Sequence, residues 1–241
     1  MSAALLALLA GCSALPTPRQ PPISRRTAVC AAAALPFARS SRASVEDSGR
    51  ARLLAAIARG EGVEAAIDGI VALDPSNGRG ATDAALAGRW RLLWSANAAA
   101  FSPLLQLPSA VRPQSYQLIG AAAERAGVGS GRIAQLLELP LGATVELSSA
   151  VLPSSPSVLE VFPPFRLQLL LGGRRFPLLE ADSDADFRKA NARSVEAQAA
   201  PRNQYEQQYL EVSGQPGDLR ISRVTSGDPV IVGSVFVHQR V

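Results

Sequence analysis

The chain has 241 residues and a formal net charge of +4, but the first 50 residues hold six arginines against two acids. The rest therefore carries 24 − 6 = 18 basic and 20 − 2 = 18 acidic residues, a neutral balance that argues against nucleic-acid binding. Both cysteines, Cys12 and Cys30, lie in that first part and the single histidine is His238, so we expect no metal, no cofactor and no His-dependent enzyme.

The first 45 residues have the composition of a targeting presequence. They contain no acidic residue and are rich in Arg, Ser, Pro and Ala. Residues 1–14 are apolar and end in a small-x-small pattern typical of a signal peptide; the alternative is a lipoprotein acylation box at residues 9–12. Arg25 and Arg26 precede a short apolar run, as in a twin-arginine signal, or adjoin by chance. Together these features predict import into a plastid, with the thylakoid lumen as an alternative endpoint.

Residues 46–80 are predicted to form a helical lead-in and linker. Apolar residues recur at spacings of three and four between Ser48 and Leu73, and Gly60 and Gly62 divide the run into two helices. Asp74-Pro75 ends it. The alternative is a loosely attached linker.

From Gly88 onward the apolar period changes to two, which indicates strands. Trp90, Leu92 and Trp94 alternate with polar and other residues, so we expect both tryptophans on one face, directed to the interior. No apolar run reaches the roughly 20 residues of a membrane-spanning helix. Further strands are predicted at 115–120, 135–139, 144–151, 158–162, 165–171, 174–179, 205–212, 218–225 and 230–239. Short strands separated by turns predict an antiparallel barrel or sandwich over residues 81–241.

Two groups of motifs resemble the plastid-lipid-associated, or fibrillin, family. The first is Leu86-Ala-Gly-Arg-Trp-Arg-Leu-Leu-Trp-Ser95, followed by Pro103-Leu-Leu105 and Tyr116-Gln117. The second is Tyr209-Leu-Glu211, Gly217-Asp-Leu-Arg-Ile-Ser-Arg223 and Gly233-Ser-Val-Phe-Val237. Glu211 departs from the Asp usual in the family, residues 224–229 replace a short Gly-Asp turn, and residues 120–200 match loosely.

This resemblance implies a mainly β, lipocalin-like antiparallel β-barrel with a short N-terminal helical segment. It also implies plastid location at thylakoids or plastoglobules and binding of a lipid, prenylquinone or carotenoid, without assigned catalytic residues. The alternative is a structural coat protein of those surfaces, whose barrel is filled by side chains. The expected partners are therefore a hydrophobic small molecule and a peripheral membrane surface. Catalysis by carboxylates such as Glu146 or Glu160 would be the only enzymatic reading, and their spacing does not argue for it.

The candidate ligand-binding residues are aromatic and apolar: Trp94, Leu92, Tyr116, Phe162 and Phe165. A barrel of about eight strands holds one small ligand in its mouth. The segment 161–165 is either a loop at the barrel mouth that dips into membrane or a buried strand corner.

Five further residues are predicted to be structural: Gly88, Trp90, Asp218, Arg220 and Arg223. We expect Trp90 to pack in the core at the closed end. By analogy with lipocalins, Arg223 is predicted to stack on Trp90, because it shares a strand face with Leu219 and Ile221. Asp218 and Arg220 are predicted to pair across neighbouring strands at a strand entrance, with a polar ligand-head role as the alternative. His238 is predicted to be an exposed strand residue.

Overall fold

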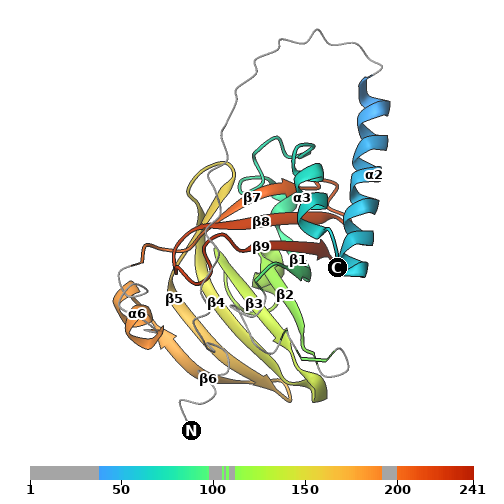
Figure 1. Cartoon of the computed structure of the whole chain (residues 1–241). Coiled ribbons are helices and arrows are strands. Elements are labelled where there is room, and N and C mark those ends of the chain that lie inside the picture. Colours follow the sequence, from blue (N-terminus) through green and yellow to red (C-terminus); the bar gives the residue numbers. More distant parts are fainter. Residues whose placement is uncertain (1–37, 98–104, 106, 109–111, 192–199) are drawn as a thin grey trace.

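The structure is a computed structural model that describes residues 38–97, 105, 107–108, 112–191 and 200–241 (Figure 1). The predicted presequence lies outside this part, apart from its last eight residues. Helix α2 (Ala38–Arg59) begins before the predicted boundary at residue 45, and α3 (Val63–Val71) follows. Gly60 and Gly62 separate them with positive φ, as the glycine spacing predicts. Of the helices in the described ranges, none has the length and apolarity to cross a membrane.

Within the described residues, nine strands form one antiparallel sheet, so the mainly β fold class is confirmed. Most predicted strands are found with small shifts at their ends. The strands are β1 (Gly88–Ser95), β2 (Gln114–Ile119), β3 (Arg132–Glu138), β4 (Thr144–Pro153), β5 (Val158–Leu171), β6 (Arg174–Ala181), β7 (Gln204–Leu210), β8 (Leu219–Ser226) and β9 (Val235–Arg240).

The order of the strands is β4-β3-β2-β1-β9-β8-β7-β5-β6, and β4 also pairs with β5. That extra pairing joins the sheet into a circuit of eight strands, the nine less β6, which is attached to β5 outside the circuit. Strand β5 belongs to both parts. Its first residues, 158–160, pair with β7, and residues 165–171 pair with β6 (Figure 1).

One face of the sheet, called here the inner face, carries Trp90. Side chains from five strands meet there: Trp90 of β1 packs in a cluster with Ile119, Ile133, Val161 and Leu210 of β2, β3, β5 and β7. The short helix η1 (Ala84–Leu86) contributes Leu86 to the same cluster. Because apolar side chains from across the circuit converge on one tryptophan, the inner face is closed by packing at this end.

The opposite, outer face is covered in part by helices. Leu53 of α2 and Ile70 of α3 are buried in a cluster with Leu219, Ile221 and Val237 of β8 and β9. Figure 1 shows α2 and α3 beside the ends of β7, β8 and β9. A second short helix, α5 (Ala121–Arg125), covers the outer side of β2 and β3 through Ala122 and Ala123. Helix α6 (Asp184–Asn191) follows β6.

Strand β5 replaces two predicted strands. It runs from Val158 to Leu171 without interruption, so the segment 161–165 is not a mouth loop but lies inside a strand. Pro163 and Pro164 fall between the residues that pair with β7 and those that pair with β6. A proline has no N–H to donate, and here the missing donors lie where the strand changes its neighbour.

The prediction that Trp90 and Trp94 share a face is wrong. The pairing of β1 with β9 shifts between Leu92 and Trp94, so that Trp94 lies opposite Val237. Val237 belongs to the outer cluster under the helices, and Trp94 packs against that same cluster. A β-bulge inserts one residue, which moves every later side chain to the other face.

Candidate ligand-binding site

The closed end of the inner face is built around Trp90, which is 0% exposed. Its indole Nε1 donates a hydrogen bond to the carbonyl of Leu86, 2.9 Å away. Two guanidiniums lie near the ring, with the Cζ of Arg240 4.3 Å and the Cζ of Arg220 5.1 Å from the ring centre. Trp90 is therefore a packed core residue, as predicted, and it contacts two buried cations.

Arg240 fastens the last strand to the segment before β1. Its guanidinium donates to the backbone carbonyls of Ala85 and Ala87. A Cβ on Gly88 would lie 2.2 Å from Arg240 Nη1, so a side chain here would force this guanidinium to move. Gly88 thus leaves the space that the Arg240 guanidinium fills.

Asp218 is the carboxylate that pairs with Arg240 at the closed end of the inner face. It lies just before β8, accepts hydrogen bonds from the Ser213 hydroxyl and from the Gly214 amide at 2.8 Å, and lies 3.6 Å from Arg240 Nε. Its predicted position at a strand entrance is confirmed. Its ion pair joins it to Arg240 of β9, however, and not to Arg220.

Arg220 is 1% exposed and its hydrogen-bond partners are neutral. One terminal nitrogen, Nη2, donates to the side-chain carbonyl of Gln117 and lies 3.2 Å from His238 Nδ1. A guanidinium can only donate, so His238 accepts at Nδ1 and carries its proton on Nε2. The Arg220 Nε is buried and has no hydrogen-bond partner among the described residues.

Burial and charge act together on this group. Burial, and then the nearby Arg240 cation, lower the pKa of the Arg220 guanidinium to about 9. Burial and the Arg220 cation likewise hold the pKa of His238 well below its ordinary value. His238 is 3% exposed, so the prediction that it is an exposed strand residue is wrong. The interior therefore contains a neutral imidazole beside a cation that burial disfavours.

A row of cross-strand partners connects this polar group to open apolar surface. Gln117 lies opposite Gln135, Gln135 lies opposite Leu147, and Leu147 lies opposite Leu167. Directly opposite residues share a face, so all four belong to the inner face. Leu147 is nevertheless 42% exposed. Two strand spacings of about 4.8 Å place its backbone roughly 10 Å from that of Gln117.

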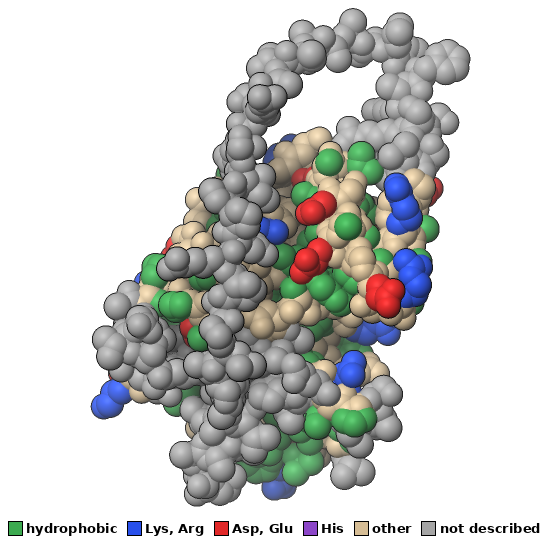
Figure 2. All heavy atoms as spheres, in the orientation of Figure 1, with side chains coloured by type: hydrophobic (Ala, Val, Ile, Leu, Met, Phe, Trp, Pro, Cys, Tyr) green, Lys and Arg blue, Asp and Glu red, His purple; other side chains and the backbone are tan. Residues whose placement is uncertain are grey.

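Apolar side chains surround this exposed position. Leu137, Val145 and Leu167 form a buried cluster, against which Leu169 and Leu179 pack. Figure 2 shows hydrophobic side chains gathered at the lower end of the view, where Figure 1 places the ends of β5 and β6. The inner face thus passes from a packed end at Trp90, through a polar group around Arg220, to a partly exposed apolar end.

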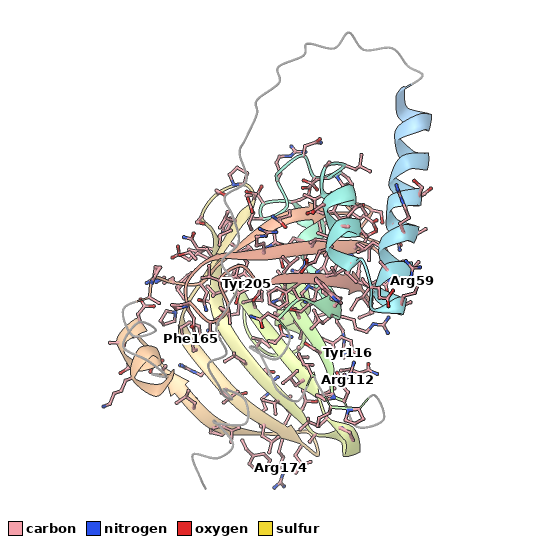
Figure 3. All side chains as sticks on the ribbon, viewed as in Figure 1. Arg59, Arg112, Tyr116, Phe165, Arg174 and Tyr205 are labelled. Carbon is pink, nitrogen blue, oxygen red and sulfur yellow. The ribbon has the colours of Figure 1, made fainter. Side chains whose placement is uncertain are left out.

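The five predicted ligand-binding residues are not all on the inner face. Leu92 packs there, against the cluster of Val224 and Phe236, and Phe165 is on the same face as Leu167. Tyr116 packs in the outer cluster under α5, with Arg89 4.1 Å above its ring. Figure 3 shows Tyr116 and Phe165 far apart, on the β2 and β5 sides.

Phe162 and Trp94 also face away from the interior. Phe162 follows the inner residue Val161, so it points to the opposite face, where the Arg202 guanidinium lies 5.3 Å from its ring centre. Trp94 lies under the helices. The structure therefore brings two of the five predicted residues to the inner face and distributes the other three over the outer one.

The predicted stacking of Arg223 on Trp90 is wrong. Arg223 does share a face with Leu219 and Ile221, but that is the outer face, and Arg223 is exposed. Arg220 and Arg240 occupy the places that Arg223 was expected to fill. Because both faces of β8 are largely buried, its apolar pattern does not reveal which side is the interior.

The two carboxylates considered for catalysis are engaged in ion pairs. Glu146 is buried on the outer face and lies 3.4 Å from Arg175 of β6; its burial raises its pKa. Glu160 lies 3.1 Å from Arg202 and also accepts from the Gln204 amide. Neither belongs to the polar group around Arg220.

Sequence reasoning missed Gln117, His238 and Arg240 as members of the site. In the last strand, His238 and Arg240 alternate with Val237 and Gln239. The available signal was that the two basic residues share one strand face. Gln117 carries no such signal, because the pairings of β2 with β1, β1 with β9 and β9 with β8 together bring it next to Arg220.

No protein-family model matches the chain, and no curated protein or solved structure matches it significantly.

Proposed function

We propose that the chain is a lipocalin-like β-barrel protein of the fibrillin type that binds one hydrophobic small molecule: a lipid, prenylquinone or carotenoid. The observation that carries the proposal is the exposure of Leu147 on the inner face of a closed circuit of strands. A barrel filled by side chains would bury such a residue, as it buries Trp90 at the other end. Barrels of about eight strands are wide enough for one small ligand.

The chemistry of the inner face suits a long apolar molecule. Leu137, Val145 and Leu167 adjoin Leu147, so a chain placed there would contact carbon atoms on several sides. Each methylene group transferred from water to such a surface contributes about 0.8 kcal/mol. We propose a carrier without catalytic activity.

A plastid location, at thylakoid or plastoglobule surfaces, is part of the proposal and is supported by the composition of residues 1–45. Import of the full chain into isolated chloroplasts tests it. We expect a shortened, protease-protected product that fractionates with thylakoids or plastoglobules. A full-length product that stays outside the organelle would contradict the location, and a soluble lumenal product would favour the lumen.

The binding function is tested by equilibrating the full chain with phosphatidylcholine vesicles that contain a prenylquinone, a carotenoid and oleyl alcohol. The protein is then separated from the vesicles and examined by native mass spectrometry. We expect one lipophile per chain in the wild type. The Leu147→Arg variant should lose at least nine-tenths of this occupancy, because a guanidinium would occupy the apolar surface.

The matched control is Leu152→Arg. Leu152 is on the same strand, is more exposed than Leu147 and follows the inner residue Val151, so it points to the outer face. We expect its occupancy to equal that of the wild type. A protein that carries no lipophile yet floats with the vesicles would favour the structural coat, and equal loss in both variants would contradict the assigned face.

A further inference from the structure

The charges around Trp90 do not balance. Arg220 and Arg240 lie on this tryptophan, while Asp218 is the carboxylate in contact with them, through Arg240. Within the described ranges Arg220 forms no ion pair. The group therefore holds one positive charge in excess, in a place where all three ionised side chains are almost fully buried.

A buried cation without an anion is costly. Removing an ion from water is offset only when a counter-charge and hydrogen bonds replace the solvent. Around Arg220 the replacements are incomplete: the Gln117 carbonyl and His238 Nδ1 are neutral acceptors, and Nε has no partner in the part of the chain that the structure describes. An anion within reach of this guanidinium would supply both the missing charge and the missing acceptor.

The neighbourhood also limits the kind of anion. One excess positive charge matches a head group with a single negative charge, such as a carboxylate, whose two oxygens fit the planar guanidinium. The row from Gln117 through Gln135 leads to the exposed Leu147, roughly 10 Å away along the inner face. A molecule that reached from Arg220 to Leu147 would need a polar end and an apolar chain of several carbons.

We propose that the chain's ligand is a long-chain lipid carboxylate whose head group binds Arg220, assisted by Gln117 and His238, and whose hydrocarbon chain lies against Leu147. This inference rests on the proposed carrier function and narrows it to one ligand class. Arg240 is not the primary contact, because both of its terminal nitrogens donate to the carbonyls of Ala85 and Ala87 and Asp218, 3.6 Å from its Nε, already balances its charge. Trp90 forms the wall behind the head group.

The test is a competition between two lipids with the same chain. The full chain is equilibrated with phosphatidylcholine vesicles that contain equal amounts of oleate and oleyl alcohol, and native mass spectrometry measures the ratio of the two complexes. We expect the wild type to prefer oleate at least tenfold. In Arg220→Gln the ratio should fall to about one, whereas Arg220→Lys, which keeps the charge, should retain a preference.

Arg223→Gln is the matched control, because it removes an arginine from the same strand on the outer face, and it should leave the ratio unchanged. A wild-type ratio near one, or a preference that survives in Arg220→Gln, would overturn the carboxylate inference while the carrier function stood. A wild type that takes up neither lipid would instead refute the carrier function. The wild-type ratio decides the matter even where Arg220→Gln does not fold.

Discussion

The substitution Gly88→Ala tests the closed end of the sheet most sharply. The new methyl carbon would lie 2.2 Å from Arg240 Nη1 and 3.2 Å from its Cζ, whereas carbon atoms in contact are separated by about 3.5–4.0 Å. The guanidinium must therefore move by roughly 1 Å or more, away from the position that its contacts require. This displacement breaks the 2.7 Å hydrogen bond from Nη1 to the Ala87 carbonyl and loosens the stacking on Trp90.

The expected cost follows from these two contacts. A hydrogen bond from a charged group contributes about 1.5–3 kcal/mol, and a desolvated cation–π contact contributes about 2 kcal/mol, of which a part is lost. We therefore expect Gly88→Ala to lower the free energy of unfolding by about 2–4 kcal/mol, a large share of the roughly 5–15 kcal/mol that stabilises a domain. Urea denaturation followed by circular dichroism measures it.

A double-mutant cycle separates the clash from other effects of the methyl group. In an Arg240→Leu background the guanidinium is absent, so adding Gly88→Ala should cost less than about 1 kcal/mol. The coupling energy between the two positions should then be about 2 kcal/mol. A cost of Gly88→Ala that is the same in both backgrounds would refute the reasoning, since the effect would not depend on Arg240.

Three further predictions concern groups that join distant segments. Burial holds the pKa of His238 far below that of the unfolded imidazole, so the unfolded state binds the extra proton as pH falls below about 6.5. The free energy of unfolding should therefore decrease toward acid pH, by up to about 1.4 kcal/mol per pH unit. His238→Gln should flatten this slope in urea titrations at several pH values. An unchanged slope would assign the pH dependence to other groups. Arg50 of α2 donates to Glu211 at 2.6 Å, so Arg50→Ala should speed hydrogen exchange in α2 more than in α3, and equal rates would mean that the ion pair does not anchor the helix. Asp74 accepts the amide of Leu210 at 3.0 Å, and Asp74→Ala should lower the free energy of unfolding by about 1–3 kcal/mol in the same urea assay; a loss below about 0.5 kcal/mol would contradict this role.

The strands and the two N-terminal helices could be predicted because their signals are local. Period two, glycine turns and the Gly60–Gly62 break depend on neighbouring residues and survive in the structure. The faces of the strands could not be predicted as well. Trp94 lies on the outer face because of a bulge in β1 that no residue type predicts. Arg223 lies on a face that is apolar because helices cover it.

The candidate site depends on contacts between residues far apart in the chain. Gln117 and Arg220 are 103 positions apart, and His238 is 18 positions beyond Arg220. Each is an ordinary polar residue of a strand when read alone, and only the circuit of pairings makes them neighbours. From the sequence, Arg220 was identified within a fibrillin-like motif, with a structural role as the prediction and a polar ligand-head role as the alternative.

The attachment of β6 divides the molecule into parts that need not unfold together. The eight-strand circuit closes without β6, which among the described strands pairs only with residues 165–171 of β5. Loss of β6 and the following α6 would therefore leave every pairing of the circuit intact, whereas loss of any other strand would break it. Local opening of this segment requires less free energy than global unfolding. In hydrogen exchange under native conditions, we therefore expect the amides of β6 to exchange together as a separate unit, and earlier than those of β8 and β9.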